Sequence, residues 1–378
     1  MSALTTIAPA PTIPNTGEGS QLVWSSHHIH SLSVVVLSPH NQCNCRCVMC
    51  DIWRIREPKE ITPALLETQR DSFRKLGVRW VVLSGGEPQR NPQLCTLARM
   101  LHDLGIRVTL LTAGTLLSAE AEVLAAAVDD VIVSLDGPTA VHNRIRRIPR
   151  AFELLMDGVG ALRRFRPEIV VRARCTVQRE NHASLRATVQ SAKDHGLNSI
   201  SFLAVDAVSD AFNHPQGWTQ PKADSVTLDA QQVEILEREM EDLIHDYASD
   251  LNSAFVVETA AKLRRIVQQF RVYLGQAQPV APRCNAPWVS AVIGAEGDVR
   301  PCFFHPAFGN IHDSSLQEIV NSPQALRFRD ELDIANNPIC RRCVCSLHVP
   351  QGDSEEIFQP KLSSVKGEKE KSCWSGIR

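Results

Sequence analysis

The sequence lacks an excess of charge of either sign. Its 40 lysine and arginine residues nearly balance 42 aspartate and glutamate residues, and the formal net charge at pH 7 is −2 with histidine neutral. Bulk electrostatics therefore indicates no polyanionic partner, and we expect no binding to nucleic acid or to an anionic membrane surface.

The sequence also lacks a segment that would cross a membrane. No stretch has the roughly 18 uncharged apolar residues that a bilayer-spanning helix needs. Residues 1–20 are rich in Ala, Pro, Thr and Gly and have neither a basic start nor a continuous apolar run, so they predict no signal peptide. We expect a cytoplasmic protein whose residues 1–30 form a flexible tail.

Cysteine, by contrast, is abundant. The chain has 12 cysteines, and most of them fall in two groups, one near residue 45 and one towards the C-terminus. In a reducing cytosol, clustered thiols indicate metal binding rather than disulfides. The isolated Cys95 and Cys175 lie in apolar helical or strand patterns, where we expect inert buried thiols.

Residues 32–206 alternate short apolar runs with amphipathic stretches of helical length, which is typical of repeated βα units and a parallel sheet. This pattern predicts an α/β fold, a partial, TIM-like (β/α)6 barrel, although an open doubly wound sheet fits equally. In either fold, chemistry gathers at the C-terminal ends of the strands. The predicted strands are 32–37, 78–84, 106–112, 130–135, 169–177 and 199–205, and the predicted helices are 62–76, 92–104, 118–128, 152–165 and 182–195.

The predicted barrel core spans residues 31–225. A helical bridge follows over 226–280, with helices expected at 230–248 and 254–274. A small cysteine-rich domain is expected over 281–350, and a polar tail over 351–378.

The first cysteine group follows the first predicted strand, with the sequence Cys-Asn-Cys-Arg-Cys-Val-Met-Cys over residues 43–50. Cys43, Cys47 and Cys50 have C-x3-C-x2-C spacing, which lets a short loop bind three irons of a cubane cluster and leaves one iron open. An open metal position permits an exogenous ligand to bind. Zinc held by these three cysteines and Cys45 is the alternative.

This loop resembles the signature of the radical S-adenosylmethionine (radical SAM) superfamily. The resemblance implies that Cys43, Cys47 and Cys50 hold a 4Fe–4S cluster whose open iron binds the methionine part of S-adenosylmethionine. In that superfamily, electron transfer then cleaves the sulfonium, and a deoxyadenosyl radical abstracts hydrogen from the substrate. The chain differs from many relatives in having Met49 where an aromatic residue is frequent.

The sequence Gly-Gly-Glu-Pro ends the second predicted strand. Glycines let the backbone approach a ligand closely, and a carboxylate accepts hydrogen bonds from an ammonium group. The segment resembles the superfamily's GGEP motif, which binds the amino end of the cofactor. The resemblance therefore implies cofactor contacts from Gly85, Gly86, Glu87 and Pro88.

Three further strand ends fit the same cofactor site. The resemblance places Thr112 in a motif similar to Thr-Asn-Gly, and Ser134 against the ribose or methionine moiety. Arg174 suits the cofactor carboxylate because a guanidinium binds carboxylates in a bidentate manner, although a surface salt bridge would also explain it. We expect His142 and Arg144 in a loop that could face substrate or solvent.

In the second cysteine group, twelve residues separate Cys284 from Gly297 and four more precede Cys302. This spacing and the later cysteines resemble the C-terminal SPASM and twitch domains of the superfamily, which hold auxiliary iron–sulfur clusters. Val349 stands where the full SPASM pattern needs another cysteine, so we expect one auxiliary 4Fe–4S cluster. Its expected ligands are Cys284, Cys302, Cys340 and Cys343, with Cys345 as a substitute. A zinc knuckle that includes His348 is the alternative.

We therefore expect an oxidoreductase-type radical SAM enzyme with two 4Fe–4S clusters. It would oxidise or epimerise a small natural-product or cofactor precursor and take electrons from an external donor such as flavodoxin or ferredoxin. A peptide-modifying maturase is the second hypothesis, less favoured because only 42 residues precede Cys43. A non-catalytic iron–sulfur or zinc redox protein is the third. The sequence identifies no catalytic acid, base or hydrogen-atom donor.

Overall fold

The strands form one nine-stranded sheet in the computed structural model, which describes residues 27–215 and 217–349. The strand order is β6-β5-β4-β3-β2-β1-β7-β8-β9, and β1 to β7 run parallel while β8 and β9 are antiparallel. The sheet stays open, with β6 and β9 at its edges, so the predicted α/β class and partial barrel are confirmed. The strands are β1 Val34–His40, β2 Trp80–Gly85, β3 Arg107–Thr112, β4 Asp130–Ser134, β5 Val170–Val177, β6 Ser199–Ala204, β7 Ser290–Ile293, β8 Asp298–Arg300 and β9 Gly309–Asn310.

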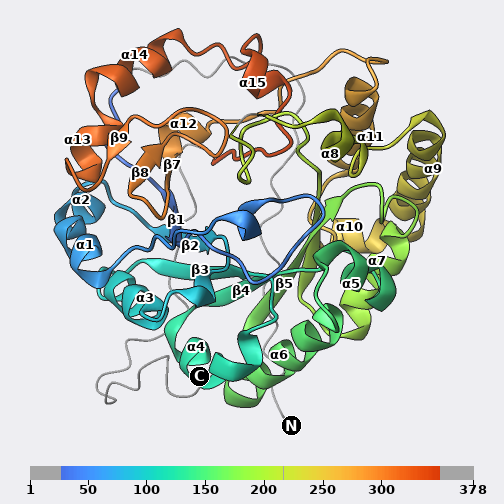
Figure 1. Ribbon diagram of the computed structural model, residues 1–378, viewed down its shortest axis with the longest axis horizontal. Coiled ribbons are helices and arrows are strands. Elements are labelled where there is room, and N and C mark those ends of the chain that lie inside the picture. The colour runs from blue at the N-terminus through green and yellow to red at the C-terminus, as the bar shows by residue number, and fades with distance from the viewer. Residues whose placement is uncertain (1–26, 216, 350–378) are drawn as a thin grey trace.

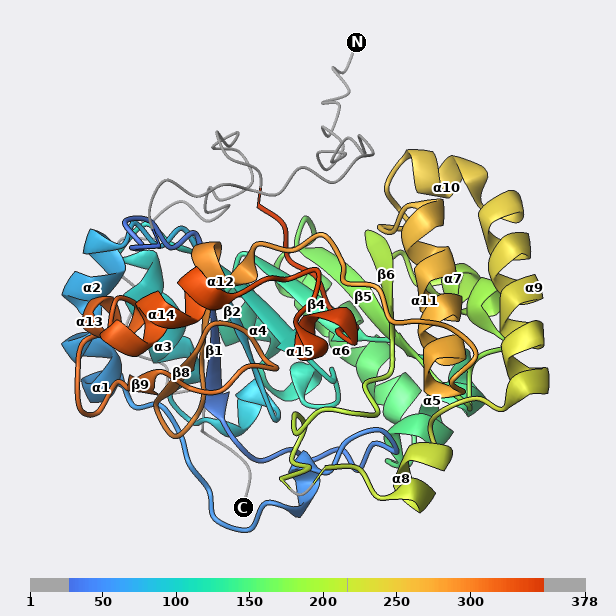
Figure 2. The same ribbon diagram turned by 90° about the horizontal axis from the view of Figure 1, so that it is seen from above.

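Helices cover the outer side of the curved sheet, from α1 and α2 near β1 round to α7 near β6 (Figure 1). Seen from above, α9 to α11 stand at the β6 end, while α13 and α14 lie at the β1 end (Figure 2). The helices are α1 Pro63–Thr68, α2 Arg70–Lys75, α3 Leu94–His102, α4 Leu117–Ala127, α5 Thr139–Arg146, α6 Ala151–Phe165, α7 Leu185–Asp194, α8 Gln220–Asp224, α9 Ala230–Asp246, α10 Ala248–Asn252, α11 Ala260–Tyr273, α12 Ala286–Val289, α13 Leu316–Val320, α14 Pro323–Glu331 and α15 Pro338–Arg341, with 3-10 turns η1 Ile52–Arg54 and η2 Pro88–Arg90.

Each of the six predicted strands of the barrel forms within a few residues of its expected position. Apolar side chains are buried on both faces of the sheet, as the successive residues Val34 and Val35 of β1 show with 3% and 0% exposure. Parallel strands covered in this way have nearly continuous apolar sequences, and that signal located them.

The second bridge helix begins later than predicted. Residues 254–274 were expected to be helical, but α11 begins at Ala260 because the preceding segment pairs with the edge strand β6. The Ile200 backbone N–H donates to the Phe255 carbonyl at 2.7 Å, and the Val257 N–H donates to the Ile200 carbonyl at 2.9 Å. Near Val256, backbone hydrogen bonds to the edge strand β6 therefore take the place of helical hydrogen bonds.

The expected cysteine-rich C-terminal domain begins inside the barrel's own sheet. β7 pairs in parallel with β1, from Val34 opposite Ser290 to Leu37 opposite Ile293. The helix predicted over residues 62–76 is broken into α1 and α2 at Gln69. The buried Gln69 side chain forms hydrogen bonds with the same C-terminal region. The proposed domain boundaries stay predictions.

Both isolated cysteines are buried as expected, Cys95 at 2% and Cys175 at 0% exposure. Cys175 is a free thiol. Cys95 is disulfide-bonded, so the expectation of a free thiol there is wrong. Most of the two predicted tails, residues 1–26 and 350–378, lies outside the described residues.

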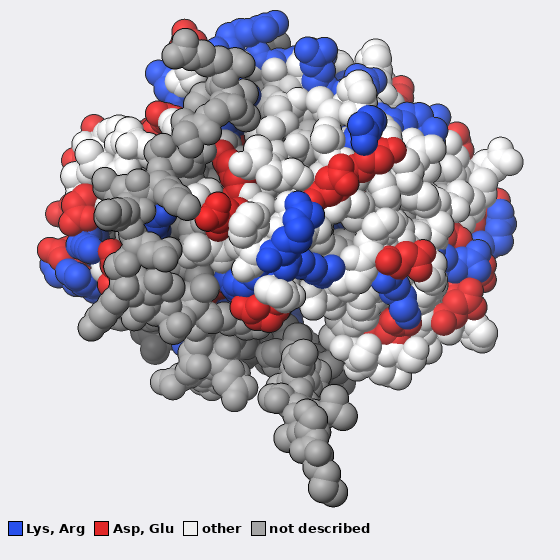
Figure 3. Space-filling view, turned by 90° about the horizontal axis from the view of Figure 1, so that it is seen from below, with Lys and Arg blue, Asp and Glu red and all other residues white. Residues whose placement is uncertain are grey.

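Basic and acidic side chains are interspersed with other residues on the face shown in Figure 3, as the small net charge suggests. Among the helices of residues 27–215 and 217–349, none has the length and apolar character needed to span a bilayer.

Replacing Gln69 by Ala tests the link between the barrel and the C-terminal region. The Gln69 amide, 2% exposed, donates to the Ile311 carbonyl at 3.1 Å and accepts from the Leu316 N–H at 2.8 Å. Gln69→Ala leaves both backbone groups buried without a partner, so we expect the free energy of unfolding to fall by about 3 kcal/mol. Urea unfolding measures this, with Gln324→Ala, an exposed glutamine on α14, as the control that should change little. Equal stability of both variants would contradict the prediction.

Candidate functional site

Four thiols lie together on the loop that follows β1. The Cys45 side chain hydrogen-bonds with those of Cys43 and Cys47, and Cys50 interacts electrostatically with Cys47. Cys45 and Cys47 are 1% and 7% exposed and pack against Ala113, next to the end of β3, while Cys43 and Cys50 are half-buried. The structure thus brings together the three cysteines selected by spacing and the additional cysteine of the zinc alternative.

Two other segments hold this loop through its backbone. The N–H groups of Arg46 and Val48 donate to the carbonyls of Arg146 and Ile145 at 3.2 and 3.0 Å. These carbonyls end α5, where helix geometry leaves them without an internal donor. Lys222, in α8, donates from Nζ to the Val48 carbonyl at 2.6 Å.

The glycine turn after β2 packs against the start of the same loop. The Gly86 N–H donates to the His40 carbonyl at 3.1 Å, and the Glu87 N–H donates to the Gln42 carbonyl at 2.9 Å. A Cβ on Gly86 would lie 2.2 Å from the Gln42 carbonyl oxygen, and Gly85 has φ +113°. Glycine at these positions therefore permits the approach of β2 to the residue before the first cysteine.

The Glu87 carboxylate is fully buried and lies against the end of β3. It accepts hydrogen bonds from the Thr112 hydroxyl at 2.8 Å, from the Ala113 N–H at 2.9 Å and from the Gln89 N–H at 3.3 Å. Burial raises the pKa of Glu87, and the hydrogen bonds from Ala113 and Thr112 oppose the rise. In this structure Glu87 and the buried Pro88 therefore fix the positions of neighbouring strand ends.

Ser134, Arg174 and Ser201 occupy one row across β4, β5 and β6. The exposed Arg174 donates from Nε to the Ser201 hydroxyl at 3.4 Å. Within residues 27–215 and 217–349, no carboxylate lies at salt-bridge distance from it. The surface-salt-bridge interpretation of Arg174 thus gains no support, and its guanidinium is available to an anionic group.

The pKa values of three thiols of the loop, those of Cys45, Cys47 and Cys50, are raised. The hydrogen bond with Cys43 contributes most to raising the pKa of Cys45, which reaches about 12. Burial raises the pKa of Cys50 to about 12. The positive charges of Arg146 and Lys222 oppose these shifts at Cys45 and Cys50, respectively. A bound metal deprotonates a coordinating thiol, and these two cations would favour the thiolate form.

His142 and Arg144 belong to α5, so the expectation of a loop at these positions is wrong. The fully buried His142 accepts at Nδ1 from the Asp136 N–H at 3.2 Å, and burial lowers its pKa to about 4. Arg144 forms an ion pair with Glu180. Neutral and buried, His142 supports the structure beneath the cysteine loop.

The second group brings together five thiols from distant parts of the sequence. Cys340 interacts electrostatically with Cys302 and Cys284, and Cys343 interacts with these two and with Cys345. Burial raises the pKa of Cys340 to about 12, and it also raises the pKa values of Cys302, Cys343 and Cys345. The four expected ligands and the possible substitute therefore form one cluster of donors.

Polar contacts that the sequence did not reveal hold this second group. Asn337 caps α15 by accepting from the Cys340 N–H at 3.1 Å, and Arg265 of α11 donates to the Cys343 carbonyl at 2.8 Å. The His305 Nε2 lies 3.4 Å from the Cys340 sulfur. Arg265 and His305 have partners 78 and 35 residues away, which no local pattern encodes. Asn337, directly before Pro338, is by contrast a local signal for the start of a helix.

Cys345 lies between the second thiol group and the barrel. Burial raises its pKa, whereas the charges of Arg174 and Lys262 oppose the rise and that of Asp206 adds to it. Since Arg174 is on β5 and Asp206 follows β6, Cys345 interacts with residues at the strand ends as well as with other cysteines.

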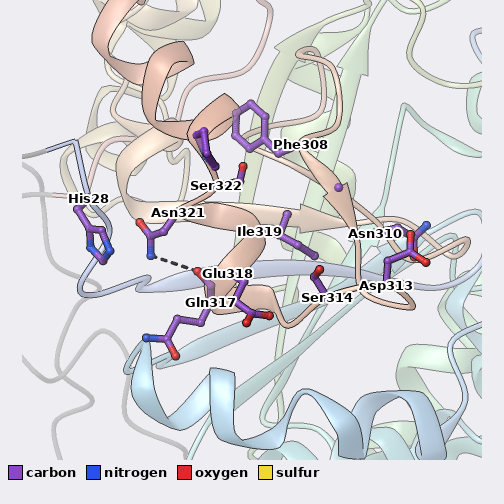
Figure 4. Close-up of a pocket in the computed structure, with 12 residues that line it drawn as sticks. His28, Phe308, Asn310, Asp313, Ser314, Gln317, Glu318, Ile319, Asn321 and Ser322 are labelled. Carbon is purple, nitrogen blue, oxygen red and sulfur yellow. Dashed lines mark hydrogen bonds between the residues drawn. The ribbon is translucent and has the colours of Figure 1, made fainter.

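A pocket of about 750 Å³ lies elsewhere, between the N-terminal residues and α13 (Figure 4). His28, Phe308 and Asn310 line it, and no cysteine does. It is therefore separate from both thiol groups. Across residues 27–215 and 217–349, no three His, Cys, Asp or Glu side chains are arranged as ligands of a single metal ion.

Two family models match the chain. The model of the radical SAM superfamily matches residues 37–192, and the SPASM model, described as an iron–sulfur cluster-binding domain, matches residues 284–344. The first matched segment contains Cys43 to Cys50, and the second contains Cys284 to Cys343 but ends one residue before Cys345.

Among curated proteins, the chain is 26% identical to an AdoMet-dependent heme synthase of Methanosarcina barkeri, over 84% of this chain and 94% of that protein. It is also 26% identical to the subtilosin biosynthesis protein AlbA of Bacillus subtilis, over 75% of this chain and 58% of that protein. The solved structure of Streptococcus suis SuiB bound to S-adenosylmethionine has a TM-score of 0.58 at 14% identity, covering 89% of this chain and 79% of that one. This structural likeness shows the shared fold.

Replacing Gly86 by Ala should displace the cysteine loop. The added Cβ would collide with the Gln42 carbonyl, and a backbone carbonyl cannot move aside as easily as the end of a flexible side chain. We expect about four fewer irons per chain after anaerobic reconstitution, the content of one cubane cluster. In the control Gly160→Ala, the new Cβ meets only the end of Arg164 at 4.0 Å, and iron content should not change. Full iron content in Gly86→Ala would contradict the proposed role of the turn.

Proposed function

Because the chain joins a radical SAM domain to a SPASM iron–sulfur domain, we propose that it abstracts hydrogen from a small natural-product or cofactor-precursor molecule as an oxidoreductase-type enzyme. The two domains imply two 4Fe–4S clusters and S-adenosylmethionine as cofactors. The observation that supports the proposal most is the shared sheet. β1 leads into the first thiol group, and its neighbour β7 lies between Cys284 and Cys302, so one scaffold positions both groups.

The first thiol group suits an iron–sulfur cluster in number and kind of donor. We assign Cys43, Cys47 and Cys50 as its ligands because their spacing leaves one iron open, and Cys45 as a neighbouring thiol that does not bind iron. A cluster held by these cysteines would supply, once reduced, the electron for cleavage of S-adenosylmethionine and so the radical chemistry that abstracts hydrogen from the substrate. The protein's contribution is to hold the three sulfurs at the strand ends.

The strand-end residues suit S-adenosylmethionine. Arg174 offers an exposed guanidinium to the carboxylate of the cofactor, and Ser134 lies beside it in the strand register. The turn of Gly85 and Gly86 offers close backbone approach to the amino end. Glu87, buried against Thr112, fixes the edges of this site, while its part in binding the ammonium group stays a prediction.

For the auxiliary cluster we assign Cys284, Cys302, Cys340 and Cys343 as ligands. Cys345 is then the remaining thiol, and it interacts electrostatically with Arg174 at the strand ends as well as with Cys284 of the second group. A fully ligated cluster held there would accept the second electron, the one that a substrate radical loses to complete its oxidation, which favours net oxidation over redox-neutral epimerisation.

For the substrate, the extent of similarity favours a small molecule. The match to the heme synthase covers 94% of that protein, whereas the match to AlbA covers 58% of it. A tetrapyrrole precursor of haem is therefore the first substrate class to test, and a peptide is the second. Reduction of the clusters requires an external donor, for which we propose flavodoxin or ferredoxin.

Two cysteine variants test the ligand assignment. After anaerobic reconstitution the wild type should hold about eight irons, and Cys47→Ala about four, with no deoxyadenosine formed from S-adenosylmethionine. The matched variant Cys45→Ala should keep about eight irons and form deoxyadenosine. Zinc in place of iron, or loss of iron in Cys45→Ala but not in Cys47→Ala, would contradict the assignment.

A substrate panel tests the reaction class. Reduced enzyme is incubated with S-adenosylmethionine and, separately, a haem-precursor tetrapyrrole, an aminocyclitol, a nucleoside or a peptide. We expect deoxyadenosine to form in step with an oxidised tetrapyrrole, measured by mass spectrometry. Turnover of the peptide alone would support a maturase instead.

The variant Cys302→Ala serves as the control in the same panel. It should still form deoxyadenosine, because the first group is intact, but it should release little oxidised product.

A further inference from the structure

Arg146, the last residue of α5, carries a charge buried directly behind the first thiol group. The residue is 8% exposed, and its Nη1 donates to the Cys47 sulfur at 3.5 Å. An uncompensated buried charge is strongly unfavourable, and here the fully buried Asp136 carboxylate forms an ion pair with the same guanidinium. Asp136 in turn accepts from the Thr176 N–H of β5 at 3.0 Å, which fixes the pair against the sheet.

The same helix end also holds the backbone on both sides of Cys47. The carbonyls of Ile145 and Arg146 accept hydrogen bonds from Val48 and Arg46, the residues that flank this cysteine. Backbone and side chain of α5 therefore act on a single position of the loop. Arg144, on the same helix, is exposed and pairs with Glu180 at the surface instead.

A guanidinium suits this position better than an ammonium. Its planar fork can donate to a carboxylate and to a sulfur at the same time, whereas the ammonium of lysine acts as a compact point charge. Hydrogen bonds and positive charge at the sulfurs of an iron–sulfur cluster are among the factors that set its reduction potential. Both stabilise the reduced form, which carries one more negative charge.

We propose that Arg146 is a positioning residue that fixes the Cys47 sulfur and raises the reduction potential of the first cluster through an N–H···S hydrogen bond. The inference rests on the assignment of Cys47 as a ligand. It adds a residue from outside the cysteine loop to the control of that cluster, with Asp136 holding the guanidinium in place.

The test is a redox titration of the reconstituted protein followed by electron paramagnetic resonance. The first cluster is identified by the change in its signal when S-adenosylmethionine is added. In Arg146→Gln we expect the equilibrium to shift about tenfold towards the oxidised form, which is about 59 mV for a one-electron couple. The control Arg144→Gln should keep the wild-type potential.

Arg146→Gln leaves Asp136 buried without its partner, so a second variant guards against misfolding. In Asp136→Asn/Arg146→Gln both charges are removed together, and an amide oxygen remains for the Thr176 N–H. This double variant should bind iron and show a potential below that of the wild type, by less than in Arg146→Gln because the negative charge of Asp136 is removed as well. A double variant with the wild-type potential would overturn the proposal.

If the double variant does not fold, Arg146→Lys decides, because a lysine cannot bond both partners at once. A lowered potential or lost iron in Arg146→Lys supports the proposal, and wild-type potential and iron content overturn it. Iron retained at the first site in Cys47→Ala would instead show that the ligand assignment is wrong, which separates the two failures.

Discussion

The candidate site depends on the close approach between Gly86 and the Gln42 carbonyl, because this contact fixes where the cysteine loop leaves the sheet. A side chain at Gly86 would occupy the space that the carbonyl fills. From that point the loop crosses the strand ends, where α5 binds its backbone from one direction and Lys222 from another. A metal-binding loop that is held in place before metal arrives loses less entropy on binding than a loop that is free to move. These contacts give the four thiols one location.

Two positively charged side chains lie close to the thiols of the first group. Arg146 faces Cys45 and Cys47, and Lys222 faces Cys50, so each cation opposes the rise in thiol pKa that burial and neighbouring thiols cause. Neutral thiols tolerate burial while the site is empty, and thiolates formed on metal binding gain partners already in position. The parallel pairing of β7 with β1 then joins this site to the second thiol group without a flexible linker between them.

The structure was predicted best from the sequence where a single physical signal determines it. Apolar runs located the six barrel strands because both faces of a parallel sheet are buried, and cysteine spacing selected residues that the fold does bring together. Helix α5 was missed because it is short and mostly polar, with Val141 and Ile145 as its only large apolar residues, and with it His142 was misplaced. The roles of Arg146, Lys222 and His305 depend on partners 99, 174 and 35 residues away, a separation that no local pattern encodes. The pairing of β7 with β1 is a long-range contact of the same kind.

The most direct test of the central claim asks whether S-adenosylmethionine binds an iron that the protein leaves open. Reduced, oxygen-free protein is mixed with S-adenosylmethionine labelled with ¹⁵N in its amino group and ¹⁷O in its carboxylate, and hyperfine couplings are recorded by electron–nuclear double resonance. We predict coupling of both nuclei to one cluster, with loss of the signal in Cys50→Ala. A cluster that shows no coupling to either nucleus, or zinc at Cys43, Cys47 and Cys50, would contradict the account.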